Sequence, residues 1–175
     1  MRLARRHLLP ILALAGFTVP HRSSAAAPSG KPVYILNGPN LDLLGKRQPD
    51  LYGRDSLQDV ERLCRETGNR LGLGIEFRQT NSEGGLVDHV HEAREKAAAI
   101  VINPAAYAHT SVALQDALHA CELPIIEVHL TNTFKREAYR HTDYAAQVAT
   151  AQINGCGTNG YRLALEQVHH LLDKA

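Results

Sequence analysis

Cysteine is scarce in this chain of 175 residues, and its three copies show no pairing. Cys64, Cys121 and Cys156 are odd in number, lie far apart and form no CxxC motif, so the sequence predicts neither a disulfide framework nor a zinc site. Because unpaired cysteine behaves as a small apolar side chain, we expect all three to be buried.

Net charge is also nearly absent, since 19 Lys and Arg residues stand against 18 Asp and Glu residues. A formal charge of +1 gives no strong overall field, which argues against recruitment of nucleic acid or of an acidic membrane surface. An anionic ligand would have to be bound by local geometry. The length favours one domain, large enough to bury a core without disulfides or metals.

Several cofactor and nucleophile motifs are missing. The chain has no GxGxxG and no GxxxxGK[ST] nucleotide-binding motif, and no GxSxG turn that would expose a serine nucleophile. Its ten His residues show no recognised metal-ligand spacing, even at the pair His89 and His91. We therefore expect neither a cofactor nor a metal, which leaves acid–base chemistry on a small molecule.

The N-terminus differs in composition from the rest of the chain. Basic residues precede a twelve-residue apolar run at 8–19, and a cluster of small residues follows at 23–27. This order predicts a cleavable export signal at 1–27, and the run is too short for a stable membrane anchor. The Arg-Arg pair at 5–6 also resembles a twin-arginine signal, as an alternative to the general secretory route. We expect a periplasmic or exported protein with a single domain at 28–175; if the start codon lies downstream, the protein is cytoplasmic.

From residue 31 onward, β-rich runs alternate with amphipathic helical patterns. Five segments are predicted as strands: 32–37, 74–79, 99–104, 124–130 and 149–154. Apolar residues at three- and four-residue spacing predict helices over 56–72, 83–98, 111–122 and 160–175. Ser56 and Ser111 are the predicted helix caps. The alternation predicts an α/β fold, a flavodoxin-like doubly wound five-stranded parallel sheet with helices on both faces.

Ligands of such sheets bind at the carboxyl ends of the strands, and polar residues gather there in this sequence. The segment GKRQPDLYG (45–53) carries Tyr52 among few core-forming residues, so this tyrosine is either held by something other than a core or mobile. A tyrosine is a poor base unless a cation stabilises its phenolate. Arg47 on the same loop can supply that cation. The alternative is that Tyr52 only anchors the loop by packing.

Other positions also suit acid–base chemistry. Asn37 and Asn40 in the NGPN segment can hold a water or an enolate oxygen, or they are plain turn residues. Glu127 and His129 share one face of a strand, where the carboxylate would raise the basicity of the imidazole and make it a general acid. A structural His at the strand end is the alternative. His109 either precedes a helix cap or donates to a substrate hydroxyl.

Six segments resemble, in order and separation, the type II 3-dehydroquinate dehydratases: LNGPNLDLLGKRQPDLYG, EGGLVDHVHEA, INPAAYAHTSVALQDAL, IEVHLTN, REAYRHTDY and GYRLALE. The resemblance spans residues 32–167. It implies a hydro-lyase that converts 3-dehydroquinate to 3-dehydroshikimate and water by anti elimination through an enolate, with no metal and no Schiff base. The pathway would be the shikimate route or quinate degradation.

The resemblance also implies roles for individual residues. Tyr52 would be the base on a closing loop, assisted by Arg47, and His129 the acid that protonates the departing hydroxyl, oriented by Glu127. Asn40 would help to hold the water that stabilises the enolate. A second group would bind the substrate: Asn103, His109, Asp116, Leu130, Thr131 and Arg140. The family forms dodecamers of four trimers in which the aspartate reaches a neighbouring site, so we expect this homo-oligomer here.

Departures from the family pattern are few. The family more often has Asn, Thr, Arg and Ser at four positions, which here are Asp42, Lys46, Gln115 and Thr131. Two other functions stay open: an exported, non-catalytic binding protein for quinate-like cyclic acids, and a flavodoxin-like FMN carrier. The joint presence of Arg47, Tyr52 and His129 argues against the first. The lack of a Ser/Thr-rich phosphate loop after the first strand argues against the second.

Overall fold

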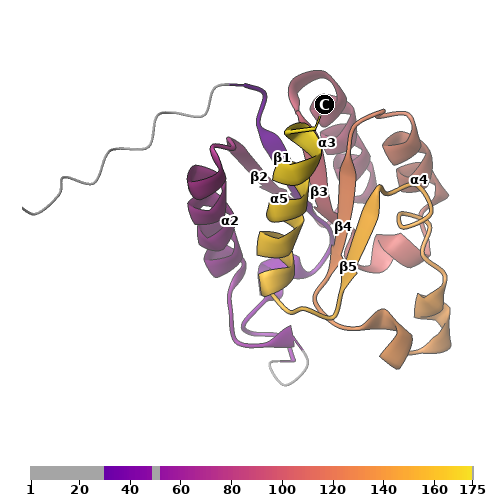
Figure 1. Ribbon diagram of the computed structural model, residues 1–175. Helices are drawn as coiled ribbons and strands as arrows, with labels where there is room; N and C mark the ends of the chain where they lie inside the picture. The colour runs from indigo at the N-terminus through magenta and orange to yellow at the C-terminus, as the bar shows by residue number, and fades with distance from the viewer. Residues whose placement is uncertain (1–29, 49–51, 175) are drawn as a thin grey trace, which may run out of the picture.

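The computed structural model describes residues 30–48 and 52–174, and its centre is a five-stranded sheet (Figure 1). The strands lie in the order β2-β1-β3-β4-β5, and every neighbouring pair is parallel. This is the order of flavodoxin-like sheets, so the predicted fold class is confirmed. The predicted export signal lies outside the described residues. The strands are β1 (Val33–Asn37), β2 (Ile75–Gln79), β3 (Ala99–Asn103), β4 (Ile125–His129) and β5 (Ala151–Asn154).

Helices cover both faces of the sheet. On one face lie α2 (Leu57–Leu71) and α5 (Asn159–Leu172), and on the other α3 (Glu83–Lys96) and α4 (Val112–His119). Each lies within the range predicted for it or extends it by one residue. The doubly wound arrangement follows because connections between parallel strands are right-handed. A helix therefore lies on one face of the sheet when the chain moves one way across the strands, and on the other face when it moves the opposite way.

Serine side chains begin these helices. The Ser56 hydroxyl accepts the backbone N–H of Asp59, whose carboxylate accepts the backbone N–H of Ser56 in return, so that α2 begins with a capping box. Ser111 caps α4 by accepting the N–H of Leu114 at 2.9 Å. Both predicted caps are therefore confirmed. Ser82, which the sequence predictions omit, caps α3 in the same way.

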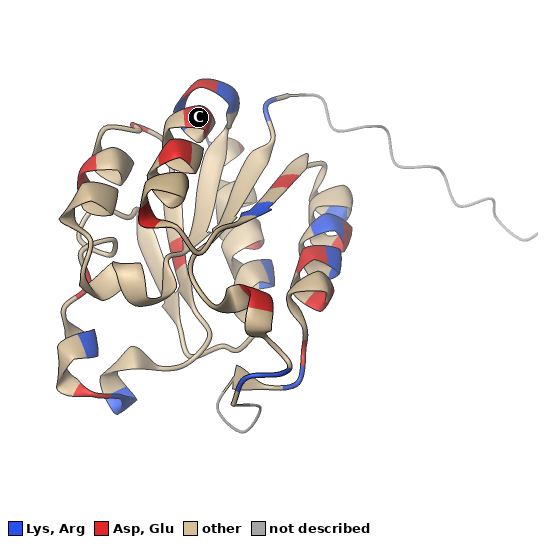
Figure 2. Ribbon diagram, turned by 180° about the vertical axis from the view of Figure 1, so that it is seen from behind, with Lys and Arg blue, Asp and Glu red and all other residues tan. Residues whose placement is uncertain are grey.

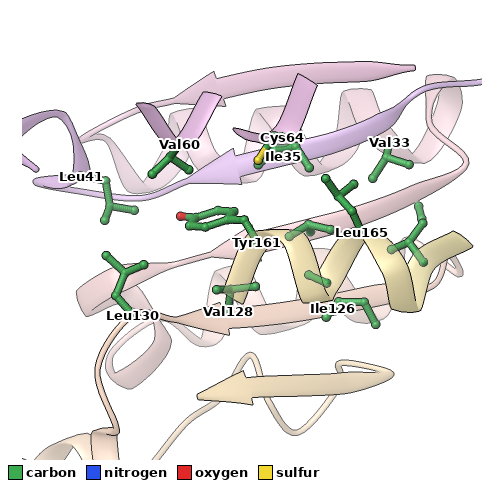
Figure 3. Close-up of a cluster of buried hydrophobic side chains, with 14 of the residues drawn as sticks. Val33, Ile35, Leu41, Val60, Cys64, Ile126, Val128, Leu130, Tyr161 and Leu165 are labelled. Carbon is green, nitrogen blue, oxygen red and sulfur yellow. The ribbon is translucent and has the colours of Figure 1, made fainter. Parts of the chain in front are cut away.

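Alternate residues of the central strands enter two separate apolar clusters. Val33 and Ile35 of β1 join the cluster under α2 and α5 (Figure 3), whereas Tyr34 and Leu36 join the cluster under α3 and α4. The alternation follows from the pleat of a strand, whose successive side chains point to opposite faces. Because both faces are covered, the strand is apolar at nearly every position.

Strand β4 follows the same alternation but carries polar residues on one face. Ile126 and Val128 join the cluster under α2 and α5. Ile125 joins the other cluster, and Glu127 and His129, at the same parity, are buried beyond it toward the end of the strand. The strand thus directs two ionisable groups to one face of the sheet.

The cysteines divide between core and surface. Cys64 and Cys121 are buried, one in each cluster, whereas Cys156 is exposed after β5. Burial raises the pKa of the Cys64 thiol to about 12, which keeps it protonated and unreactive. The prediction that all three cysteines are buried is wrong for Cys156. It lies between Gly155 and Gly157, both with positive φ, in a turn that runs over the surface.

Positively and negatively charged residues are interspersed along the helices in Figure 2, as the near-zero net charge suggests. On α2, Arg62 lies 2.6 Å from Asp59 and Arg65 lies 2.7 Å from Glu61. In the part of the chain that the structure describes, no helix combines the length and the apolar character needed to cross a bilayer.

The carboxyl ends of the strands meet at one edge of the sheet, where the register sets side chains side by side. Asn37 of β1 pairs with Asn103 of β3. A Cβ on Gly38 would lie 2.5 Å from the carbonyl oxygen of Pro104, so only glycine allows the segments after β1 and β3 to approach this closely. Short 3₁₀ helices follow the strands at this edge: η1 (Leu41–Leu43), η2 (Ala105–His109), η3 (Thr133–Lys135) and η4 (Ala138–His141).

Candidate active site

A cavity of about 110 Å³ opens at this edge of the sheet, bounded by the segments that follow β1, β3 and β4. The sequence argument placed the site at the carboxyl ends of the strands, and most of the predicted site residues line this cavity. They are Asn40, Arg47, Tyr52, Asn103, His109, His129, Leu130, Thr131 and Arg140.

Two predicted site residues do not line the cavity. Glu127 is fully buried on β4, and its carboxylate touches the ring of His129 instead. Asp116 is exposed on α4 and is not among the residues that line the cavity of its own chain.

Tyr52 lies beside two guanidinium groups. The guanidinium carbon of Arg47 is 6.0 Å from the centre of the tyrosine ring, and that of Arg136 is 5.8 Å from it. Arg136 also donates to the Tyr52 hydroxyl at 3.4 Å and to the Thr131 hydroxyl at 3.1 Å. A phenolate formed here would therefore carry its negative charge next to two cations. The predicted partner Arg47 is present, but Arg136 contacts the oxygen directly.

The setting of Tyr52 corrects one interpretation of the sequence. Tyr52 is half-buried and packs against the apolar cluster under α2 and α5, so it is not held by something other than a core. Leu41 and Leu44, earlier in the same connection, are buried in that cluster. They extend the core to the edge of the sheet, where Tyr52 can reach it. Residues 49–51 of the predicted closing loop lie outside the described residues.

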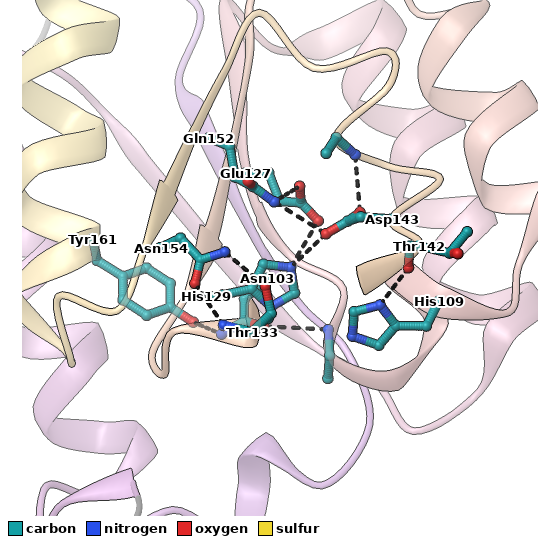
Figure 4. A network of polar contacts seen from close by, with 12 residues as sticks. Asn103, His109, Glu127, His129, Thr133, Thr142, Asp143, Gln152, Asn154 and Tyr161 are labelled. Carbon is teal, nitrogen blue, oxygen red and sulfur yellow. Dashed lines mark hydrogen bonds and ion pairs between the residues drawn. The ribbon is translucent and has the colours of Figure 1, made fainter. Parts of the chain in front are cut away.

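His129 is only 6% exposed, and two carboxylates meet at its Nε2 (Figure 4). Glu127 lies at 3.0 Å and Asp143 at 3.1 Å. Because an ionised carboxylate only accepts hydrogen bonds, Nε2 carries a proton, and Nδ1 is the nitrogen left to serve a ligand. Burial by itself lowers the pKa of His129, but the hydrogen bonds and charges of Asp143 and Glu127 outweigh burial and raise that pKa to about 9.

Asp143, which follows η4, belongs to a network around this imidazole. Its Oδ1 accepts the backbone N–H of Ala146 at 3.0 Å. Gln152 on β5 donates to Asp143 Oδ2 and to Glu127 Oε2, each at 3.0 Å. Burial is the largest influence on both carboxyl groups, and it raises the pKa of Glu127. For Asp143 the hydrogen bonds outweigh burial, with that from His129 the largest, and lower the pKa.

His109 stacks on His129, with ring centroids 5.8 Å apart and planes inclined by 17°. Its Nδ1 lies 2.8 Å from the carbonyl oxygen of Thr142. Since a carbonyl only accepts, Nδ1 donates its proton there, and Nε2 of the neutral ring is an acceptor. Burial lowers the pKa of His109. The two stacked imidazoles thus differ in charge near neutral pH, with His109 neutral and His129 positive.

Asn103 is held in place by a buried polar chain that runs through the core. Its Nδ2 donates to the Tyr161 hydroxyl at 3.2 Å, and its Oδ1 accepts the N–H of Ala105 at 3.2 Å. The Tyr161 hydroxyl donates in turn to Asn37 Oδ1 at 2.6 Å. In Figure 3 this hydroxyl points from α5 toward the carboxyl ends of the strands. These hydrogen bonds pair buried polar groups that would be costly to leave without partners. They also fix the position of the Asn103 amide, which borders the cavity.

Asn40 lies in a turn at the wall of the cavity. Its backbone is left-handed, with φ of 66°, a region that Asn adopts more readily than most residues. Its N–H donates to Asn81 Oδ1 at 2.8 Å. Asn40 is thus a turn residue, and it also lines the cavity.

The sequence predictions omit Arg136, Asp143 and Gln152. Arg136 and Asp143 belong to the polar segment REAYRHTDY after β4, in which the predictions include only Arg140. The signal that the sequence offers for Arg136 and Asp143 is their place in a run of ionisable residues after the carboxyl end of a strand. Gln152 reaches the network because β5 pairs with β4, which sets it directly beside Glu127. No local pattern indicates that contact.

Glu127, His129 and Asp143 are also the group of described residues that could share a metal, because their ligand atoms all lie within 4.8 Å of one another. Those atoms hydrogen-bond one another and Gln152. The arrangement as it stands is that of a network that holds protons.

The cavity therefore presents a phenol beside two cations and a protonated imidazole hydrogen-bonded to carboxylates. One group can remove a proton and the other can deliver one, as the elimination of water requires. The neutral His109, the Thr131 hydroxyl and the Arg140 guanidinium, all at the cavity wall, can bind hydroxyl groups and a carboxylate.

Comparison with known proteins agrees with this chemistry. The model of the family described as Dehydroquinase class II matches residues 31–169. A 3-dehydroquinate dehydratase of Methylobacterium radiotolerans is 56% identical over 139 residues, which are 79% of this chain and 93% of the relative. A 3-dehydroquinate dehydratase 2 of Pseudomonas putida is 51% identical over 142 residues, 81% and 95% of the two chains. The crystal structure of type II dehydroquinase from Propionibacterium acnes matches with a TM-score of 0.79 at 40% identity, covering 83% of this chain and 99% of that chain. The predicted resemblance is confirmed, and the chain belongs to the class II, or type II, dehydroquinase family.

Proposed function

We propose that the protein dehydrates 3-dehydroquinate to 3-dehydroshikimate by anti elimination through an enolate. The observation that carries the proposal is the presence in one cavity of Tyr52, beside two guanidinium groups, and of His129, backed by two carboxylates. Relatives that are named 3-dehydroquinate dehydratase support the same reaction. The alternative of a non-catalytic binding protein gains no support from them.

The first step is removal of a proton from C2, the carbon next to the C3 ketone of the substrate. The Tyr52 phenolate takes this proton, and the electron pair moves to place a negative charge on the ketone oxygen. Arg136, 3.4 Å from the Tyr52 hydroxyl, and Arg47 beside the ring stabilise the phenolate. Asn40 holds a water, or the oxygen itself, where this charge develops.

The second step is departure of the C1 hydroxyl. As the enolate collapses, a double bond forms between C1 and C2 and the C1–O bond breaks. Nδ1 of His129 gives its proton to the leaving hydroxyl, which departs as water. Because the pKa of His129 is raised to about 9, the imidazole is protonated and ready at neutral pH. Glu127 orients the ring through Nε2.

The remaining cavity residues bind the substrate. The neutral ring of His109 offers Nε2 to a substrate hydroxyl, and Asn103 offers the part of its amide that Tyr161 and Ala105 leave accessible. The substrate carboxylate is bound by the backbone at 130–131 with the hydroxyl of Thr131, and Arg140 supplies a positive charge at the same wall.

Two assays test the reaction and its order. Ultraviolet absorbance follows the conjugated double bond of the product, and NMR in deuterated buffer follows exchange of the C2 hydrogen. Tyr52→Phe should lower both rates about 10² to 10⁴-fold, because the enolate cannot form. His129→Ala should lower dehydration alone by a similar factor and keep C2 exchange. Tyr139→Phe is the matched control, since Tyr139 is 64% exposed and outside the cavity.

The outcomes separate the claims. If the unaltered protein leaves 3-dehydroquinate unchanged, the proposed function is wrong. If Tyr52→Phe keeps near-normal exchange, the reaction stands but Tyr52 is not the base.

We also infer that the active form is built from trimers, as a dodecamer of four trimers. Asp116 is exposed on α4, and Val112, one turn earlier on the same helix, is 53% exposed, which suits a face that meets another copy. Light scattering should give the assembly. Mixed oligomers of Asp116→Asn and Tyr52→Phe should regain activity if the aspartate completes a neighbouring site. A fully active monomer would contradict both inferences.

The export signal at 1–27 remains a proposal, with the mature domain from residue 28. The matched family model begins at residue 31, so the signal lies ahead of the matched region. Protein recovered from its native host should begin near residues 26–28, and turnover of 3-dehydroquinate should appear in the periplasmic fraction. That location would suit quinate degradation. An intact Met1 would contradict export and would favour the cytoplasmic shikimate route.

A further inference from the structure

We propose that Asp143, rather than Glu127, is the carboxylate that balances the positive charge of His129, and that it acts as a positioning residue for this acid. The role of Asp143 in catalysis rests on the proposed function. Both carboxylates meet the single proton of Nε2, at 3.0 Å for Glu127 and 3.1 Å for Asp143. Since these distances are nearly equal, the remaining surroundings of each carboxylate decide which one carries the charge.

Hydrogen bonding favours an ionised Asp143. Both carboxylates accept from His129 and from the amide of Gln152. Asp143 has a third donor, the backbone N–H of Ala146, which reaches Oδ1 at 3.0 Å. Each donor stabilises the charged form of a carboxyl group, so Asp143 is the better acceptor of the negative charge.

Solvent favours the same assignment. The side chain of Asp143 is 12% exposed, whereas that of Glu127 is 0% exposed. Asp143 also lines a second hollow of about 380 Å³, and Glu127 lines neither hollow. A charge that water can reach costs less than one enclosed in the sheet. The pKa values shift accordingly, upward for Glu127 through burial and downward for Asp143, where hydrogen bonds outweigh burial.

Among the other charged groups near His129, Arg140 lines the second hollow together with Asp143, whereas Glu127 does not line it, which also favours a negative charge on Asp143. His109 stacks on the ring as a neutral imidazole, and the rest are cations or a phenol that share the cavity with His129. The titratable and charged groups around it are Glu127 on β4, Asp143 after η4, His109 on η2, Arg136 and Arg140 after β4, and Arg47 and Tyr52 after β1.

Asp143→Asn removes the charge and keeps an oxygen that can accept the N–H of Ala146. In protein labelled with ¹⁵N at histidine, the pKa of His129 should fall by about one to two pH units in this variant. It should fall less in Glu127→Gln and stay high in Asp143→Glu, which restores the charge. Asp173→Asn is the matched control, because it removes the exposed partner of His169, 3.2 Å away, and should leave His129 unchanged.

Kinetics distinguish positioning from a loss of structure. In Asp143→Asn the alkaline limb of the kcat profile should move to lower pH together with the pKa of His129. KM and C2 exchange should stay close to those of the unaltered enzyme, because the base Tyr52 is untouched. A purely structural defect would instead lower the rate at every pH and leave the limb in place, which would overturn the proposal.

Two further results would overturn it. One is a larger fall in the pKa of His129 in Glu127→Gln than in Asp143→Asn. The other needs no variant: the ¹³C signal of the Asp143 carboxyl in the unaltered protein should be that of an ionised group at neutral pH and should shift again as His129 deprotonates. A protonated Asp143 at neutral pH refutes the assignment even if the Asn variant does not fold. These titrations need no turnover, so a failure of the proposed function would be seen separately.

Discussion

The rings of His109 and His129 stack 5.8 Å apart, yet their surroundings move their pKa values in opposite directions. Burial lowers the pKa of His109, while Asp143 and Glu127 overcome burial and raise that of His129 to about 9. Two equal side chains in contact can thus serve as a neutral binding group and as a charged acid.

The first prediction is a difference in protonation between these two rings. In ¹⁵N spectra at pH 7, His109 should appear as a neutral ring protonated at Nδ1, because that nitrogen faces the Thr142 carbonyl at 2.8 Å. His129 should appear protonated at both nitrogens and titrate near pH 9. A His109 that titrates above His129 would contradict the hydrogen-bond assignment.

The second prediction concerns stability and pH. The pKa of His129 is raised from an ordinary 6.5 to about 9 on folding, so the folded state binds this proton more tightly than the unfolded state. The stabilisation is complete below about pH 6.5 and is lost as pH rises through about 9. Urea unfolding should show a smaller loss of stability over this interval in His129→Gln than in the unaltered protein. Equal losses would count against a raised pKa.

The third prediction concerns the buried chain through Tyr161. Tyr161→Phe leaves the amides of Asn37 and Asn103 without the hydroxyl that joins them at 2.6 and 3.2 Å. Unpaired buried polar groups cost about 1–3 kcal/mol, so the free energy of unfolding in urea should fall by that amount. Tyr107→Phe is the control, because its hydroxyl bonds to the Asn81 carbonyl nearer the surface and its loss should cost less. Equal costs would mean that the chain is not a stabilising element.

The fourth prediction concerns Arg136, the direct partner of the Tyr52 hydroxyl. Arg136→Gln should lower dehydration and C2 exchange together by about 10²-fold, since a charge-stabilising donor is lost at the base. Arg162→Gln, which removes a partner of Glu166 outside the cavity, should have no such effect. A variant of Arg136 that lowers dehydration but spares exchange would link Arg136 to the acid instead.

Periodicity predicts the strands and helices well because the two clusters impose a period of two on strands such as Val33–Asn37 and of about 3.6 on the helices that cover them. The family motifs predict most of the cavity, since Asn40, Tyr52 and His129 lie within them. The order of strands across the sheet is a long-range property and enters the prediction only through the fold class.

What the sequence does not predict depends on pairing between distant segments. Asp143 and Gln152 meet Glu127 only after β5 pairs with β4 and the chain after η4 folds back. The prediction that Cys156 is buried is also wrong. The apolar character of cysteine does not indicate the turn between two glycines in which this residue is exposed.

The alternation along β4 also bears on how the sheet forms. A slip of this strand by one residue against β3 and β5 would turn Glu127 and His129 into the apolar cluster under α2 and α5, and would bring Ile126 and Val128 to the polar network. Burying a carboxylate among aliphatic side chains without its partners is heavily disfavoured. Glu127 and His129, the residues proposed for chemistry, therefore also disfavour this incorrect register of β4 in the sheet.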